Sequence, residues 1–167
     1  MAVWKLATLN IDLIYTEKLT FAEEVVTYLA TQSLGTKGTD LFYNHAPEGE
    51  TISPMTVVIG TGGAGNPHGG LPWAAPTIQV LVEASTYDAA ARQSAKIHNV
   101  LHGMFRTQLT HNFVLTSSGE GLPQSLGKTE LGRWRVSGNY SFETYVTSDS
   151  GEASTGYQGD KSPDIEA

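Results

Sequence analysis

The chain has 167 residues and no cysteine, so it is long enough for one domain with a proper core, and disulfides, thiol catalysis and cysteine-ligated zinc are excluded. Its formal net charge of −7 and its lack of a basic cluster argue against binding nucleic acid through the phosphates. No apolar run approaches the roughly 18–20 residues that span a bilayer, so we expect no membrane segment.

The two ends of the chain differ from the part between them. Residues 1–18 are apolar enough to be ordered but follow neither the helical nor the strand period, and we expect an N-terminal arm that packs on the body or on a neighbouring chain. Residues 147–167 consist largely of Ser, Gly and acidic residues, which predicts a disordered acidic tail. Residues 19–146 are expected to form a single domain.

A helix is expected directly after the arm. Thr20 and Glu23 form a capping-box pattern, apolar residues follow at helical spacing, and Gly35 is a suitable stop, which together predict about four turns. Short strands are expected at 40–43 and 55–59, with a polar loop between them.

The segment from Gly60 to Trp73 begins with G-x-G-x-x-G, the pattern of a dinucleotide-binding loop. Such a site needs a helix to open at the third glycine, Gly65, whose N-terminus holds the pyrophosphate. Prolines and further glycines follow instead, so no helix is expected before Ser85. We interpret the segment as a long loop ordered by a partner, with Leu71 and Trp73 as its apolar side chains.

The centre of the sequence is a strand that leads into a helix, from Pro76 to Gly103. The strand alternates in polarity, and its apolar face consists of Ile78, Val80, Val82 and Ala84. The period then changes to about 3.6 after a cap at Ser85 or Thr86, and the predicted apolar face of the helix is Tyr87, Ala90, Ala91, Ser94, Ile97 and Leu101.

The last third is expected to contain a strand at 112–116, a turn-rich connection at 117–130 and a long final strand. One face of that final strand is expected to be core, with Trp134, Val136, Gly138, Tyr140 and Phe142. Arg133 and Arg135 lie on its other face with Glu143, a pattern typical of surface ion pairs that can also serve a subunit contact.

Catalytic and metal-binding patterns are not found in the sequence. His98 and His102 are four residues apart on the predicted helix, but the sequence offers no third ligand, so solvated or locally bonded histidines are the better interpretation. Glu23 and Glu24 are consecutive on a helix and are expected to be solvated rather than to act as an acid–base pair. We therefore expect no enzyme activity, no cofactor and no metal.

Several motifs resemble the tail terminator proteins of long-tailed bacteriophages, also called minor capsid or tail completion proteins. The resemblance covers roughly residues 20–146 and rests on the order and spacing of five stretches, 35–42, 76–90, 97–103, 126–133 and 137–142. It does not extend to the N-terminal arm or to the acidic tail.

The resemblance implies an α+β fold, with a mainly antiparallel sheet and two principal helices packed on it. It also implies a homo-hexameric ring on the last ring of tail tube protein, at the head-proximal end of the tail in the virion. That ring would end tube growth and meet the head-completion or stopper protein, and DNA would pass through its lumen without specific binding. An acidic or neutral lumen agrees with the charge of the chain.

We expect the subunit and partner interface to include residues of the arm, the glycine-rich segment and the last strand: Trp4, Leu71, Trp73, Arg133 and Arg135. Two alternatives remain open at this point. The chain could be another tail or neck component, such as a tube or head–tail joining protein, or a small nucleotide-binding enzyme that uses the glycine-rich segment.

Overall fold

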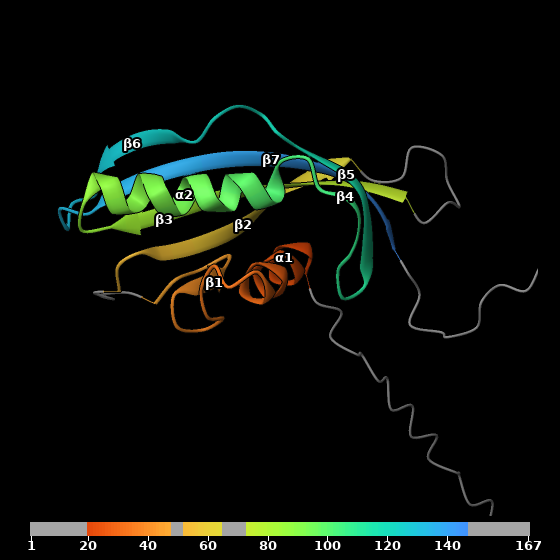
Figure 1. Cartoon of the computed structure of the whole chain (residues 1–167), viewed down its shortest axis with the longest axis horizontal. Coiled ribbons are helices and arrows are strands. Elements are labelled where there is room, and N and C mark those ends of the chain that lie inside the picture. Colours follow the sequence, from red (N-terminus) through yellow and green to blue (C-terminus); the bar gives the residue numbers. More distant parts are fainter. Residues whose placement is uncertain (1–19, 48–51, 65–72, 147–167) are drawn as a thin grey trace, which may run out of the picture.

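The computed structural model describes residues 20–47, 52–64 and 73–146 (Figure 1). The expected N-terminal arm and acidic tail lie outside the described residues, and so do Trp4 and Leu71.

The described residues form an α+β fold, as predicted, with two helices and a sheet of seven strands. The helices are α1 (Phe21–Thr31) and α2 (Tyr87–Leu101). The strands are β1 (Leu41–Tyr43), β2 (Met55–Ala64), β3 (Trp73–Ala84), β4 (Phe105–Gln108), β5 (Asn112–Gly119), β6 (Gln124–Lys128) and β7 (Trp134–Val146).

The sheet has the order β1-β2-β3-β7-β5-β4, and only the β1–β2 pair is parallel. Strand β7 pairs with β3 along one edge, from Ala84 opposite Trp134 to Trp73 opposite Tyr145. Its other edge is shared, because β5 pairs with residues 140–146 and β6 with residues 134–137. The last strand is therefore the centre of the sheet.

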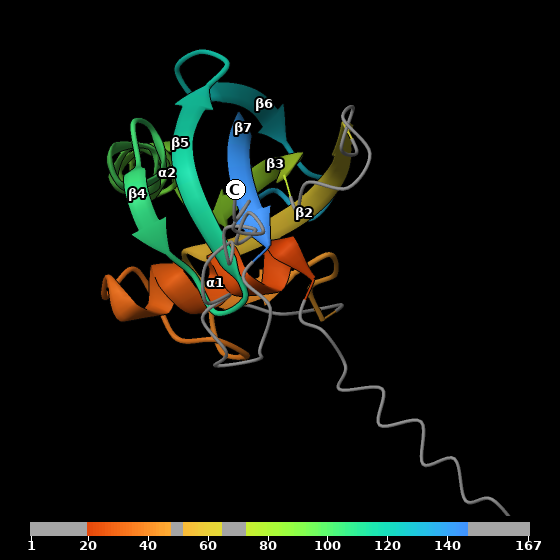
Figure 2. The ribbon, with the colours of Figure 1, turned by 90° about the vertical axis from the view of Figure 1, so that its right-hand side faces the viewer.

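Both helices begin at the predicted caps. The hydroxyl of Thr20 accepts a hydrogen bond from the backbone N–H of Glu23 at 3.3 Å, and that of Thr86 accepts one from Ala89 at 3.3 Å. Helix α1 is one turn shorter than expected, with 11 residues. The axes of the helices cross steeply, since α2 is seen from the side in Figure 1 and end-on in Figure 2, where α1 is seen from the side.

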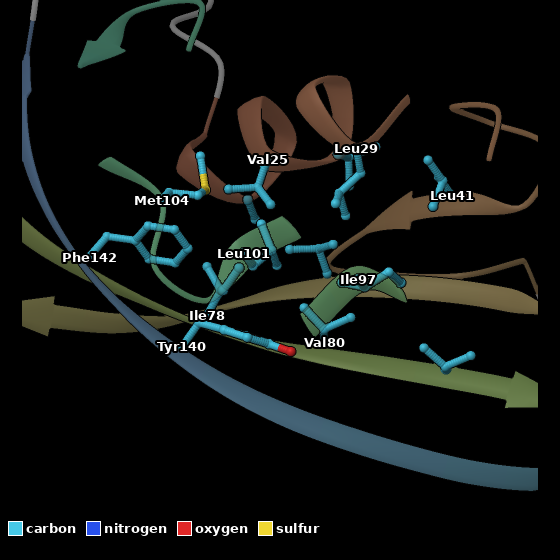
Figure 3. Packing of buried hydrophobic residues seen from close by; sticks show 14 of the residues in the cluster. Val25, Leu29, Leu41, Ile78, Val80, Ile97, Leu101, Met104, Tyr140 and Phe142 are labelled. Atoms are coloured by element: carbon cyan, nitrogen blue, oxygen red, sulfur yellow. The ribbon is translucent and has the colours of Figure 1, made fainter. Parts of the chain in front are cut away.

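Both helices pack on one face of the sheet, which we call the inner face. Val25 and Leu29 of α1 meet Ile97 and Leu101 of α2 above the strands in a single apolar cluster (Figure 3). The alternation of β3 and β7 places its apolar members on this face as predicted, and all of the following are buried: Ile78, Val80, Val82, Ala84, Val136, Tyr140 and Phe142. On α2 the prediction holds for four positions, while Tyr87 is half exposed.

Glu24 is buried in α1, and the expectation of a solvated carboxylate was wrong. Its carboxylate accepts hydrogen bonds from the backbone N–H groups of His111 at 3.0 Å and Asn112 at 3.1 Å, and from the Asn112 side-chain amide at 2.8 Å. Glu23 is not freely solvated either, because it forms an ion pair with Lys37 at 2.7 Å. Glu24 therefore fixes α1 to the turn between β4 and β5.

Three connections expected as loops or turns contain strand. Strand β4 lies in the expected link after α2, and β6 in the turn-rich connection at 117–130. Strands β2 and β3 extend into the glycine-rich segment, where Gly60–Ala64 and Trp73 were expected in a loop. Each of these strand segments forms because it pairs with a neighbouring strand, and a local sequence pattern cannot predict that pairing.

Candidate functional site

The outer face of the sheet, opposite the helices, is largely polar along β7 and the adjoining part of β3, and it is apolar over β1 and β2, where Phe42, Met55 and Val57 form a second buried cluster. Its β3–β7 pairs include Gln79 opposite Asn139 and Glu83 opposite Arg135. Gln79 also donates a hydrogen bond from Nε2 to the Ser137 hydroxyl at 3.0 Å. Because both described helices pack on the inner face, this outer face is the natural place to look for surfaces that meet other molecules.

Two of the predicted interface residues, Arg133 and Arg135, are bound to Glu83 of the same chain. Arg135 donates from Nε to Oε1 of the Glu83 carboxylate at 2.7 Å, and its Nη2 donates a second hydrogen bond to the same oxygen. Arg133, which precedes β7, lies with Nε 3.7 Å from that carboxylate and donates from Nη2 to the carbonyl oxygens of Ile52 and Glu83. Glu83, rather than Glu143, is thus their acidic partner.

Trp73 is the first residue of β3 and lies opposite Tyr145 of β7. Its side chain is partly buried, and Tyr145 is exposed. The expectation that Trp73 lies in a loop was wrong because the register with β7 continues to this position. The structure brings Trp73 together with neither arginine, since these lie at the opposite end of the same pair of strands.

The described residues of the glycine-rich segment belong to two paired strands, Gly60–Ala64 to β2 and Trp73 to β3. The register shifts between Gly60 and Gly62, and Gly62 and Gly63 have φ angles of +107° and +130°, which L side chains rarely adopt. A Cβ on Gly63 would lie 2.1 Å from the carbonyl oxygen of Ala75, so the two backbones approach more closely than any other residue permits. These glycines shape a β-bulge, and Gly60–Ala64 belongs to a strand rather than to a phosphate-binding turn.

The segment around β6, where the sequence predicted no interface residue, carries three exposed leucines. Leu122, Leu126 and Leu131 are 79%, 56% and 78% exposed, in and beside β6. We call β6 with these three leucines the leucine edge. Three leucines within ten residues of a turn-rich stretch are a sequence signal that could have marked it.

A hollow adjoins the leucine edge on the outer face. It has a volume of about 230 Å³, with Leu122 and Leu126 among its walls and the polar side chains of Gln79, Ser137 and Asn139 beside them. An apolar wall with polar groups beside it suits a side chain with an apolar body and a polar end.

The two histidines of α2 form a local cluster with β5 and β7. Their rings stack with centroids 5.0 Å apart and an interplanar angle of 11°. His98 Nδ1 lies 3.3 Å from the Tyr140 hydroxyl, and His102 Nδ1 accepts a hydrogen bond from the backbone N–H of Gly119 at 3.0 Å. The prediction of locally bonded histidines is therefore confirmed.

Burial, followed by the charge of His102, lowers the pKa of His98 below its ordinary value of 6.5. Burial raises the pKa of Tyr140 to about 12. Gly119 is required beside this cluster, because a Cβ there would lie 2.8 Å from Cε1 of His98. The cluster thus links α2 to the end of β5, and it favours the neutral form of His98.

Among residues 20–47, 52–64 and 73–146, no three potential metal-ligating side chains come together. In the same part of the chain, neither helix is both long and apolar enough to cross a membrane.

The family comparison is decisive. A family model described as "Bacteriophage tail terminator protein" matches residues 28–146. The chain belongs to this family. It is therefore a structural protein of a phage tail, and its site is a set of surfaces that contact other proteins of the virion.

Two further comparisons are weaker. A search of curated proteins found no match. Among solved structures, a chain of the "Virion of native gene transfer agent (GTA) particle" is similar with 12% identity and a TM-score of 0.49, over 72% of this chain and 84% of that chain.

Proposed function

We propose that this phage tail protein is the terminator itself, a hexameric ring that caps the last ring of the tail tube and ends its growth. The observation that carries this proposal is the match to the tail terminator family over residues 28–146, which contain the last turn of α1, all of α2 and the whole described sheet. A ring needs a heterologous, head-to-tail contact between copies, so each copy must present two different surfaces.

The partners follow from that position. One side of the ring contacts the tail tube protein and the other contacts the head-completion protein, at the head-proximal end of the tail, after assembly in the host cytoplasm. DNA crosses the lumen without specific binding, in agreement with the net charge of −7. The protein acts without catalysis or a cofactor.

The proposed organisation is an N-terminal arm (1–18), one domain (19–146) and an acidic tail (147–167). The arm contributes Trp4 to the interface, and the glycine-rich segment contributes Leu71 and Trp73. Arg133 and Arg135 contribute by holding the outer face in shape through Glu83, since their guanidinium groups are already bound within the chain.

The role of Trp73 is tested by Trp73→Ala. We expect assembly to weaken while the subunit still folds, because the side chain is only partly buried at the end of β3. Circular dichroism reports the fold, and light scattering reports assembly. Loss of the fold itself would assign Trp73 to the core.

The ring is tested by native mass spectrometry, followed by negative-stain imaging of the protein alone and after addition to isolated tail tubes. A six-subunit annulus at one end of the tubes is expected. Self-polymerisation into long tubes would instead identify a tube protein, and docking only on the portal side would identify a joining protein. A rise in melting temperature with NAD, ATP or GTP would revive the nucleotide-binding alternative, since a ligand that binds only the native state stabilises it.

A further inference from the structure

The leucine edge has a free side. Among the described strands, β6 pairs only with β7, so the backbone groups along its other edge have no strand partner there. Exposed apolar edge strands are templates for the addition of another strand. Leu126 on this strand and Leu122 and Leu131 in the turns beside it are more than half exposed, which predicts that something covers this edge.

The other edges of the sheet are poorer acceptors. Strand β1 has only three residues. Strand β4 has four, and Arg106 within it has a φ of +49°, with its guanidinium 5.3 Å from the centre of the Phe105 ring. Strand β6 also contains a residue with a positive φ, Gly127 at +85° beside the register shift with β7, so the choice between these edges rests on strand length and on exposed apolar side chains. Strand β6 is the longest of these edges, and it alone carries a cluster of exposed leucines.

The sequence before Thr20 contains a segment that fits this edge. Residues 1–18 as a whole follow neither period, but within them Leu9, Ile11 and Leu13 alternate with Asn10 and Asp12, which is the pattern of a short strand with one apolar face. The inner face of the sheet offers these apolar side chains no place, because α1 and α2 already occupy it. The chain thus has an apolar strand-like segment to bury and an apolar strand edge to cover.

The positions of the two features favour an exchange between copies. The start of α1, from which residues 1–19 lead, and the leucine edge lie toward opposite ends of the sheet (Figures 1 and 2). Residues 14–19 extend over at most about 20 Å. A donor at one end and an acceptor at the other form a head-to-tail contact, which is the kind of contact that closes a ring.

We propose that Leu9–Leu13 of a second copy of this chain adds as a strand along β6, with its apolar side chains against Leu122 and Leu126. The hollow beside these leucines would hold a side chain of the second copy from a residue next to Leu9–Leu13. This inference rests on the proposed ring and names the surfaces that hold one subunit to the next.

Cysteine cross-linking tests the contact directly, because the chain has no cysteine of its own. Full-length Leu9→Cys, Ile11→Cys and Leu13→Cys proteins are each mixed with full-length Leu126→Cys protein that carries a larger tag. The mixtures are assembled on isolated tail tubes and oxidised. A disulfide needs Cα atoms about 4.4–6.8 Å apart, so a dimer containing one tagged and one untagged chain is expected for at least one of the three positions.

Phe105→Cys is the matched control, since Phe105 is 69% exposed on the other edge strand, β4. No tagged–untagged dimer is expected with it. Rings that form without any cross-link to Leu126→Cys, or that cross-link equally to Phe105→Cys, would overturn this inference and leave the proposed function standing. Absence of rings on the tubes would overturn the proposed function and this inference with it.

A second pair of variants tests the energetic part of the inference. Leu126→Glu is expected to weaken assembly on tubes by about tenfold or more, because it puts a charge in the apolar contact. Phe105→Glu makes the same kind of change on β4 and is expected to leave assembly within about twofold of wild type. Both positions are exposed, so both variants should fold. Equal effects of the two variants would contradict the assignment of β6.

Discussion

The two faces of β7 differ in burial and in polarity. On the inner face, Val136, Tyr140 and Phe142 are buried beneath the two helices. On the outer face, Arg135, Asn139 and Glu143 alternate with them: Arg135 forms an ion pair with Glu83 of β3, and Asn139 and Glu143 are exposed. Because successive residues of a strand point to opposite faces, one stretch of sequence can specify a core and a polar surface at once. Neighbouring substitutions should therefore have very different consequences.

The largest expected effect is on the inner face. Phe142→Ala removes a fully buried ring that packs edge-to-face on Phe21 with centroids 5.0 Å apart. We expect it to lower the free energy of unfolding by about 3–5 kcal/mol. Urea denaturation measures the loss. Glu143→Ala, the next residue on the outer face, should change it by less than about 0.5 kcal/mol. Comparable losses for the two variants would contradict the division of faces.

Glu24 provides a polar counterpart to this test. Glu24→Ala leaves two backbone N–H groups and an amide without their acceptor, so we expect a loss of about 2–3 kcal/mol in the free energy of unfolding. Glu23→Ala removes only the ion pair with Lys37, whose side chain is substantially exposed, and should cost no more than about 1 kcal/mol. A Glu24→Ala protein as stable as Glu23→Ala would show that the buried carboxylate does not fix α1.

On the outer face, Arg135→Ala should have a small effect. Its side chain is 40% exposed, and Glu83 keeps Arg133 nearby, so we expect a loss of about 0.5–1 kcal/mol on thermal or urea denaturation. Arg92→Ala, which breaks the fully solvated pair with Asp88 at 2.8 Å, is the control and should cost slightly less. A loss above about 3 kcal/mol would mean that the Glu83 cluster belongs to the core.

The smallest effect concerns pH. His98 has a folded-state pKa below 6.5, so between that pKa and 6.5 the unfolded chain binds more protons than the folded chain. Its contribution to stability is therefore present above pH 6.5 and is lost as the pH falls through the folded-state pKa. Urea denaturation between pH 5 and 8, compared for wild type and His98→Gln, should show a flatter profile for the variant. His45→Gln, in the exposed loop after β1, should keep the wild-type slope.

The sequence was most informative where local pattern and tertiary environment agree. Alternation identified the buried faces of β3 and β7, and hydroxyl caps placed the starts of both helices, because each feature depends on neighbours in the chain. Strands β4 and β6 lack a buried apolar face, so their sequences show no alternation. They are strands because β4 pairs with β5 and β6 pairs with β7. Glu24 was misassigned because its hydrogen-bond donors lie 87 and 88 residues away.

The candidate site was less predictable than the fold. Nothing local indicated that Arg133 and Arg135 would meet Glu83, which is brought beside them only by the β3–β7 pairing. The leucine edge had a compositional signal, but its exposure depends on which side of β6 has a partner. The interface roles of Trp4, Leu71, Trp73, Arg133 and Arg135 stay predictions.

One edge of β7 is shared between β5 and β6, and this sharing should affect which part of the sheet unfolds locally first. Residues 140–146 lie between β3 and a β5 that is itself backed by β4, whereas residues 134–137 lie between β3 and the single short strand β6. Local openings draw on the least supported part of a fold, so amide hydrogens of β6 should exchange with solvent sooner than those of β5. If β6 gained a second neighbouring strand on assembly, its amide hydrogens would exchange as slowly as those of β5. Each subunit would then become more rigid by joining the next.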